Sequence, residues 1–227
     1  MKVYCITTGK EERLHSIKDQ ITFDFDFYYA KTEDVCLKDL SFDQNKSKNW
    51  RRKGLNRREV SCFHSHLTLW KMCYEAKTPF FIFEDNVELV RHVDSLDIEK
   101  AAVYGLVSFA QKTSYETITP HYRRMFYTRA YVISPGAAFR LYNAAMRQPV
   151  FLPVDSFISL WYLTKVRGYL SENPFFTRKS RSEIASLVGN DKPTRERIGR
   201  MSFFRFGFIT TRIYRLIMPL LLSKHVI

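Results

Sequence analysis

Hydrophobic and polar residues alternate along the start of the chain in patterns that predict an α/β fold. The apolar run at residues 3–7 predicts a short buried strand, and Leu14 and Ile17 among charged neighbours predict a helix over Glu11 to Gln20. Aromatic and Asp residues alternate from Phe23 to Tyr29, which is the period-2 pattern of a half-buried strand. A strand, a helix and a strand in this order favour an α/β sheet.

The next segments predict a loop, a long helix and a buried strand. Residues 38–58 are polar, and positions 46–58 hold seven basic residues and no acidic one, which favours a loop. Apolar residues then recur every three or four positions from Arg58 to Ala76, the pattern of a helix with one apolar stripe. The continuous run Phe80 to Phe83 predicts a strand that is covered on both faces.

The second half of the chain continues the mixed pattern. Two further strands are expected at Val103 to Phe109 and at Phe126 to Ser134. Pro135-Gly136 precedes a predicted helix from Ala137 to Met146, and an apolar helical stretch follows Asp155. We therefore expect a mixed central sheet flanked by helices.

Composition is that of a folded protein with an anionic partner. The chain of 227 residues is 45% hydrophobic and 26% charged, and its formal net charge is +13. Nucleic acid, an anionic membrane and a phosphorylated substrate all fit this charge, but no known nucleic-acid motif accompanies it. The four cysteines lack CxxC or zinc-like spacing, so we expect buried free thiols, as in a reducing cytoplasm.

The C-terminal stretch predicts a second functional element, a basic amphipathic helical segment over residues 191–227. From residue 195 onward it carries seven basic residues and one acidic residue, interleaved with Phe, Ile and Leu. This composition indicates binding to an anionic membrane surface through residues such as Arg205, Phe208, Arg212 and Arg215. A helix packed on its own domain or in a dimer is the alternative. Neither a signal peptide nor a membrane-spanning run is recognisable, so we expect a cytoplasmic protein on the inner face of the membrane.

A short acidic motif follows the predicted strand at residues 80–83. Glu84, Asp85 and Asn86 place three oxygen-bearing side chains in succession. Ligands gather at the carboxyl ends of strands in open α/β sheets, and Mg²⁺ or Mn²⁺ prefers oxygen ligands of this kind. The alternative is an acidic turn, which is common after a strand.

An ordered series of motifs surrounds this triplet. It comprises Leu55 to Cys62, Ser65 to Trp70, Ile82 to Val87, Ala130 to Ser134 with Gly136-Ala137, and Pro153 to Asp155. With Arg13 after the first strand, the series resembles glycosyltransferase family 25, which carries Glu-hydrophobe-Gly-Cys, Ser-His, aliphatic-Trp and Glu-Asp-Asp-Val at this spacing. Two positions differ from the family, because Ser61 stands in place of Gly and Asn86 in place of the second Asp.

The resemblance implies a GT-A-type nucleotide-sugar-binding domain over residues 1–190. It implies transfer of a hexose, such as galactose, from a UDP-sugar to a glycolipid or oligosaccharide acceptor of a lipooligosaccharide or lipopolysaccharide core, with inversion. The implied donor-binding residues are Thr7, Arg13, Ser65, His66, Glu84 and Asp85. Asp85 and Asn86 would hold Mn²⁺ or Mg²⁺, but a neutral amide binds a divalent cation more weakly than a carboxylate.

Catalysis is assigned to two carboxylates. Asp155 is the candidate base because inverting transfer needs a carboxylate beside the acceptor hydroxyl, and Glu59 joins it through the resemblance. The alternative for Asp155 is the N-cap of a helix, and the alternative for His66 is a structural histidine. For the whole protein the alternatives are a sugar-nucleotide-binding protein without turnover and a basic nucleic-acid-binding protein.

Overall fold

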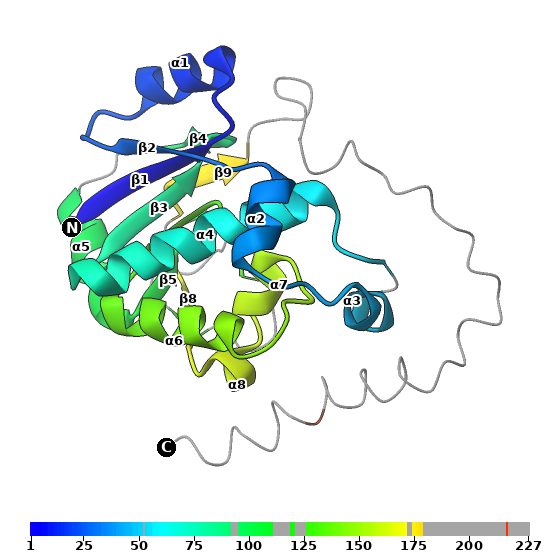
Figure 1. Ribbon diagram of the computed structural model, residues 1–227. Coiled ribbons are helices and arrows are strands. Elements are labelled where there is room, and N and C mark those ends of the chain that lie inside the picture. Colours follow the sequence, from blue (N-terminus) through cyan, green and yellow to red (C-terminus); the bar gives the residue numbers. More distant parts are fainter. Residues whose placement is uncertain are drawn as a thin grey trace.

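The computed structural model describes residues 1–51, 53–91, 95–110, 119–120, 126–171, 174–178 and residue 217. One mixed sheet lies between two groups of helices (Figure 1). The helices are α1 (Glu11–Gln20), α2 (Glu33–Asp39), α3 (Gln44–Arg51), α4 (Arg57–Ala76), α5 (Ser95–Ala101), the 3₁₀ turn η1 (Ala102–Tyr104), α6 (Pro135–Met146), α7 (Val154–Ile158) and α8 (Trp161–Thr164). The strands are β1 (Lys2–Thr7), β2 (Asp26–Tyr29), β3 (Phe80–Glu84), β4 (Val87–Leu89), β5 (Leu106–Ser108), β6 (Thr119–Pro120), β7 (Ala130–Ile133), β8 (Tyr169–Leu170) and β9 (Phe176–Arg178).

The main sheet has the strand order β2-β1-β3-β7-β5-β8-β6. β1 pairs in parallel with β2 and with β3, whereas β7 runs antiparallel to both β3 and β5. Ile6 stands opposite Glu84 in the register of β1 and β3, so both strands end at the same edge of the sheet. The predicted mixed α/β sheet is confirmed.

Both faces of the sheet are apolar and buried. Phe80 and Ile82 of β3 belong to the cluster under α4 and α6, whereas Phe81 and Phe83 belong to the cluster under α1 and α5. The period of two along a strand sends successive side chains to opposite faces, and each face here meets a helical layer. The prediction of a strand covered on both sides is confirmed.

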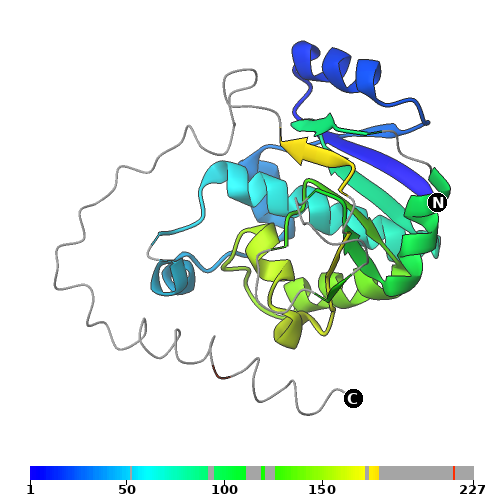
Figure 2. The same ribbon diagram turned by 180° about the vertical axis from the view of Figure 1, so that it is seen from behind.

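A small second sheet of β4 and β9 covers one side of the apolar cluster that lies under α1 and α5 (Figure 2). Val87 and Phe176 are buried, and the ring of Phe176 stacks on that of Phe83 with centroids 5.9 Å apart. Because β4 begins at Val87, residues 85 and 86 form the turn between β3 and this small sheet. The acidic triplet therefore lies between β3 of the main sheet and β4 of the small sheet, and both strands fix its position.

The loop expected over residues 38–58 is largely wrong, because α3 lies within it. Asp43 precedes α3, and its Oδ1 accepts a hydrogen bond from the Lys46 amide at 2.7 Å, as a capping side chain does. Trp50 is buried, and its ring packs on Phe151 with centroids 5.3 Å apart. A single buried aromatic residue in a polar stretch gives no readable period, although it is enough to hold a helix against the core.

Other boundaries differ less. α1 matches the prediction, α4 begins one residue earlier, and three predicted strands are shorter: β2, β5 and β7. Gly105, with φ +88°, separates the 3₁₀ turn from β5, so the strand does not extend back to Val103. Residues 191–227 lie outside the description except for residue 217, and with them the four residues expected at the membrane. Within the part of the chain that is described, no helix is long and apolar enough to cross a bilayer.

Candidate functional site

A pocket of about 330 Å³ opens at the carboxyl ends of β1 and β3. This is the edge at which ligands of open α/β sheets gather. The lining residues include the end of β1, the first turns of α1 and α4, and the whole acidic triplet. They are Ile6, Thr7, Thr8, Lys10, Arg13, Ala30, Arg58, Ser61, Cys62, Glu84, Asp85 and Asn86.

Asp85 is the buried anchor of this pocket. Its Oδ1 accepts a hydrogen bond from Nη1 of Arg13 at 2.7 Å, and its Oδ2 accepts one from Oγ1 of Thr7 at 2.8 Å. The amide of Thr8 points to the same Oδ2 at 3.4 Å, and the Thr7 hydroxyl accepts from the Gly9 amide. The structure thus brings three of the predicted donor-binding residues together, and Asp85 ties β1, β3 and α1 to one another.

These contacts do not fit a divalent cation on Asp85. Both carboxylate oxygens already accept hydrogen bonds, and the adjacent guanidinium neutralises the carboxylate. Asn86 is neutral, and its Nδ2 donates to Oε2 of Glu84 at 2.9 Å. A requirement for Mn²⁺ or Mg²⁺ stays a prediction, and the geometry argues against Asp85 as the ligand.

Glu84 is the second carboxylate of the pocket, and it is held ionised. Burial favours its neutral form, but hydrogen bonding and charge from His66, together with Asn86 and Arg129, hold the pKa of Glu84 below its usual value. The hydroxyl of Thr128 donates to its Oε1 at 3.2 Å. An ionised carboxylate at this edge can accept hydrogen bonds from the hydroxyl groups of a sugar.

His66 connects Glu84 to the core through a chain of buried polar groups. Tyr131 accepts a hydrogen bond from Nε1 of Trp70 at 2.9 Å, and its hydroxyl lies 2.9 Å from Nδ1 of His66. Since the indole can only donate, the Tyr131 hydroxyl keeps a proton that it can donate to Nδ1, and in that tautomer the ring proton of His66 is on Nε2. Nε2 lies 3.8 Å from Oε1 of Glu84, so the histidine points a donor at that carboxylate.

Among the described residues, one group of possible metal ligands lies at the pocket, and two of its members, Cys62 and Glu84, line it. Sγ of Cys62, a ring nitrogen of His66 and a carboxylate oxygen of Glu84 lie within 4.8 Å of one another. Thiolate and imidazole are ligands for Zn²⁺ rather than for Mg²⁺ or Mn²⁺. Burial, with the charges of Glu84 and Asp155, also raises the pKa of the Cys62 thiol and keeps it protonated. This group gives no support to the ions expected from the sequence.

The structure does not bring Glu59 into the pocket. Its carboxylate closes the capping box of α4 with Asn56, and it pairs with Arg51 at 2.6 Å. Ser65 is fully buried, and its hydroxyl donates to the carbonyl of Ser61 one turn earlier. Both side chains have these contacts within or beside the helix, and the roles expected of them stay predictions.

Asp155 lies near this site without lining it. Asp155 is not the N-cap of α7, because Pro153 occupies that position and Asp155 is the second residue of the helix. Burial raises the pKa of Asp155, opposed by a hydrogen bond from the Ser156 amide, and the charge of Glu84 raises it further. The half-buried carboxylate of Asp155 therefore lies within electrostatic range of Glu84, and its raised pKa suits a group that takes up a proton.

Two cations that line the pocket were not among the residues predicted to bind the donor. Lys10 is exposed after Gly9, whose φ of +80° turns the chain at the end of β1, and Arg58 lies in the first turn of α4. The sequence signal for Lys10 was its position just after a strand, and the signal for Arg58 was its position at the end of a basic run. Together with Arg13 they place three positive side chains around the pocket.

The first 103 residues of the chain are similar to a known protein family. Residues 1–103 match the sequence profile of glycosyltransferase family 25, described as an LPS biosynthesis protein. The resemblance read from the motifs is thereby confirmed over this segment, which contains every predicted donor-binding residue. Asp155 lies beyond it. No curated protein gave a match to the chain.

Proposed function

We propose that this protein transfers a hexose from a UDP-sugar to a saccharide acceptor, because residues 1–103 match the sequence profile of glycosyltransferase family 25. The observation that supports this proposal most is the pocket at the ends of β1 and β3. There Lys10, Arg13 and Arg58 line the same pocket as two carboxylates, the half-buried Glu84 and the buried Asp85. Such a site offers positive charge to a diphosphate and hydrogen-bond acceptors to a sugar.

The positive side chains supply the charge that the leaving group needs. The bond between sugar and diphosphate breaks more easily when negative charge on the departing oxygens is stabilised by preorganised donors. Arg13 is already fixed by Asp85, so Lys10 and Arg58 are the residues assigned to the diphosphate. No step of this proposal passes through a metal ion.

Asp155 is the proposed base. It takes the proton of the acceptor hydroxyl while the acceptor oxygen forms its bond to the anomeric carbon and the bond to the diphosphate breaks. Attack from the side opposite the leaving group inverts the anomeric centre. The raised pKa of Asp155 supports this assignment, since a stronger base takes a proton more readily.

The proposal extends to the identity of the donor sugar and of the acceptor. Galactose from UDP-galactose is the first donor to test, and the family description points to a lipopolysaccharide-type acceptor. An acceptor anchored in the cytoplasmic leaflet would explain a basic amphipathic stretch at residues 195–227.

A screen of UDP-hexoses tests the proposal. The purified protein is incubated with each donor in turn, and release of UDP is measured with and without an oligosaccharide acceptor. UDP release above the rate without protein, lost in Arg58→Gln but not in the exposed control Arg57→Gln, supports transfer. Donor binding without UDP release from any donor would favour the second candidate, a sugar-nucleotide-binding protein. The neutral Asn86 in place of an Asp is the observation that favours this candidate.

A further inference from the structure

A cysteine, a histidine and a glutamate meet at one wall of the proposed donor pocket. Sγ of Cys62, a ring nitrogen of His66 and a carboxylate oxygen of Glu84 all lie within 4.8 Å of one another. Cys62 and His66 are four residues apart on α4, which places them on one face of the helix, and Glu84 ends β3. Two separate elements of the fold therefore bring these three side chains together.

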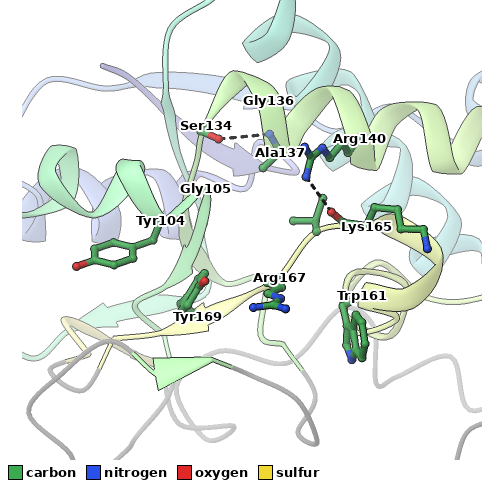
Figure 3. A pocket seen from close by; sticks show the side chains of 11 residues that line it. Tyr104, Gly105, Ser134, Gly136, Ala137, Arg140, Trp161, Lys165, Arg167 and Tyr169 are labelled. Carbon is green, nitrogen blue, oxygen red and sulfur yellow. Dashed lines mark hydrogen bonds between the residues drawn. The ribbon is translucent and has the colours of Figure 1, made fainter. Parts of the chain in front are cut away.

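A larger pocket, of about 570 Å³, offers no such ligands. It lies at the opposite end of the sheet, where Gly105 precedes β5 and Ser134 follows β7 (Figure 3). The described residues that line it are aromatic, aliphatic, small or basic, and they include no cysteine, histidine or carboxylate. Of these two pockets, only the donor pocket has side chains that could hold a metal ion.

His66 has a ring nitrogen without a hydrogen-bond partner. The residue is fully buried, and among the described residues none forms a hydrogen bond with its Nε2. Nε2 lies 3.8 Å from Oε1 of Glu84, which is long for a hydrogen bond. Two ligands at about 2.0–2.3 Å from one tetrahedral ion stand roughly 3.5 Å apart. The separation of these two atoms is therefore close to the one that a shared ion imposes.

The groups behind His66 suit a metal ligand. The hydroxyl of Tyr131 lies 2.9 Å from Nδ1 of His66 and accepts a hydrogen bond from Nε1 of Trp70. When an ion takes Nε2, the ring proton is on Nδ1 and is donated to the Tyr131 oxygen, which can accept two hydrogen bonds. Histidine ligands almost always donate their other N–H in this way, because that bond fixes the orientation of the ring.

The chemistry of the group selects a thiophilic divalent cation. Thiolate and imidazole are ligands for Zn²⁺ rather than for Mg²⁺ or Mn²⁺. The carboxylates of Glu84, Asp155 and Glu59 all lie within electrostatic range of Cys62, and negative charge of this kind favours a cation. A thiol that coordinates a zinc ion is deprotonated, so Zn²⁺ replaces the thiol proton of Cys62, which passes to water.

We propose that Cys62, His66 and Glu84 form a binding site for Zn²⁺ at the wall of the donor pocket. Three protein ligands leave the fourth position of a tetrahedral ion to water. Cys62 and Glu84 both line the pocket, so a bound ion occupies the carboxylate that is offered to the hydroxyl groups of the donor sugar. Zn²⁺ therefore inhibits sugar transfer. This inhibition rests on the proposed function, whereas the zinc site itself does not.

Cobalt substitution tests the site directly. Co²⁺ takes the place of Zn²⁺ in tetrahedral sites, and a cobalt–thiolate bond gives a charge-transfer absorption in the near ultraviolet. The full chain is titrated with Co²⁺ without any donor sugar, in a buffer that contains a phosphine reductant. We expect one equivalent of Co²⁺ to produce the absorption and Zn²⁺ to abolish it. Cys62→Ser should lose it, and Cys73→Ser, which changes a buried thiol farther along α4, should keep it.

Zinc affinity, measured by competition with a chromophoric chelator, tests the other two ligands. We expect Glu84→Gln and His66→Gln to weaken binding about 100-fold or more, since even changes around the ligands cost about 10–100-fold. His64→Gln makes the same change on the same helix, where His64 contacts Asp39, and should leave the affinity unchanged. Circular dichroism checks each fold, and the half-buried Cys62 keeps the test decisive if His66→Gln does not fold.

Two results would overturn the site: a wild-type protein without the cobalt absorption, or an absorption in Cys62→Ser equal to that of the wild type. UDP release, measured with and without Zn²⁺ in each protein, tests the inhibition. Cys62→Ser should need at least about tenfold more Zn²⁺ for the same fractional loss. Binding of Co²⁺ without any effect of Zn²⁺ on UDP release would overturn the inhibition alone. Absence of UDP release from every donor would contradict the proposed function, and the cobalt titration would still decide the site.

Discussion

Nη1 of Arg13 lies 2.7 Å from Oδ1 of Asp85, and both side chains are buried. The pair joins the first turn of α1 to the end of β3, two elements that are 72 residues apart in the chain. It lies at the floor of the proposed donor pocket. The carboxylate that the sequence assigns to a metal ion is thus paired with a guanidinium, and its binding of an ion stays a prediction.

Breaking this pair should destabilise the protein strongly. Arg13→Met leaves a buried carboxylate without its counter-charge, a change that costs about 3–5 kcal/mol of unfolding free energy. Urea unfolding followed by circular dichroism measures the change. The double variant Arg13→Met with Asp85→Asn should recover part of the loss, because no charge is then left uncompensated. Equal stabilities for the single variant and the wild type would contradict a buried ion pair.

Asp155→Asn should separate catalysis from stability. The folded-state pKa of Asp155 is raised, so its contribution is fully present below the unfolded pKa of about 3.9 and declines as pH rises through the folded value. Asparagine keeps an acceptor for the Ser156 amide but cannot ionise, so it should be at least as stable as the wild type at neutral pH. Because Asp155 is the proposed base, the same variant should lose about 10²-fold or more in turnover.

Thermal unfolding across a pH series measures the stability of Asp155→Asn, and UDP release measures its turnover. If Asp155 served only the helix, its replacement would lower stability and leave turnover nearly intact. The matched control is Asp43→Asn, which changes a carboxylate that caps α3. That variant should affect stability alone.

Tyr131→Phe tests the polar chain behind Glu84. The change removes the hydroxyl that serves both Trp70 and His66, and two buried groups lose a partner. We expect a loss of about 1–3 kcal/mol in unfolding free energy. We also expect an upward shift of the acid limb of the activity profile, because His66 no longer has its proton fixed toward Glu84. Tyr142→Phe, on the outer part of α6, is the control. An unchanged pH profile in Tyr131→Phe would remove the link between His66 and Glu84.

Chelation tests the metal expectation. With Asp85 occupied by Thr7 and Arg13, we expect EDTA to leave at least about half of the turnover, and added Mn²⁺ to change it less than twofold, since arginine and lysine supply the stabilising charge. UDP release is compared before and after EDTA, and again after Mn²⁺ is added back. Complete loss with EDTA and recovery with Mn²⁺ would show that an ion is required and would place it on other ligands.

Deletion of residues 200–227 tests the membrane expectation. Several Lys and Arg residues near an anionic leaflet each contribute about 1 kcal/mol to binding, so their removal should move the protein from the membrane fraction to the soluble one. Fractionation of cells that express each form measures this. Unchanged partitioning would contradict a membrane role for the segment, and UDP release by the shortened protein shows whether the remainder is intact.

The sequence by itself determined the elements whose pattern is local. The spacing of apolar residues placed α1 and α4 within a residue, and the run at residues 80–83 identified a buried strand. The motif series pointed to the family whose sequence profile residues 1–103 match. Each of these signals depends on residues a few positions apart, which one helix turn or one strand brings to the same face. Glu84 and Asp85 were found for the same reason.

Only the tertiary structure decided what those side chains do. Arg13 reaches Asp85 from 72 residues away, Tyr131 fixes His66 from 65 residues away, and Glu59 is drawn to Arg51 of a helix that no periodic pattern revealed. A sequence does not distinguish a carboxylate that is free to bind a ligand from one that is paired with a neighbouring side chain. The difference lies in which charges and donors the fold brings within about 3 Å.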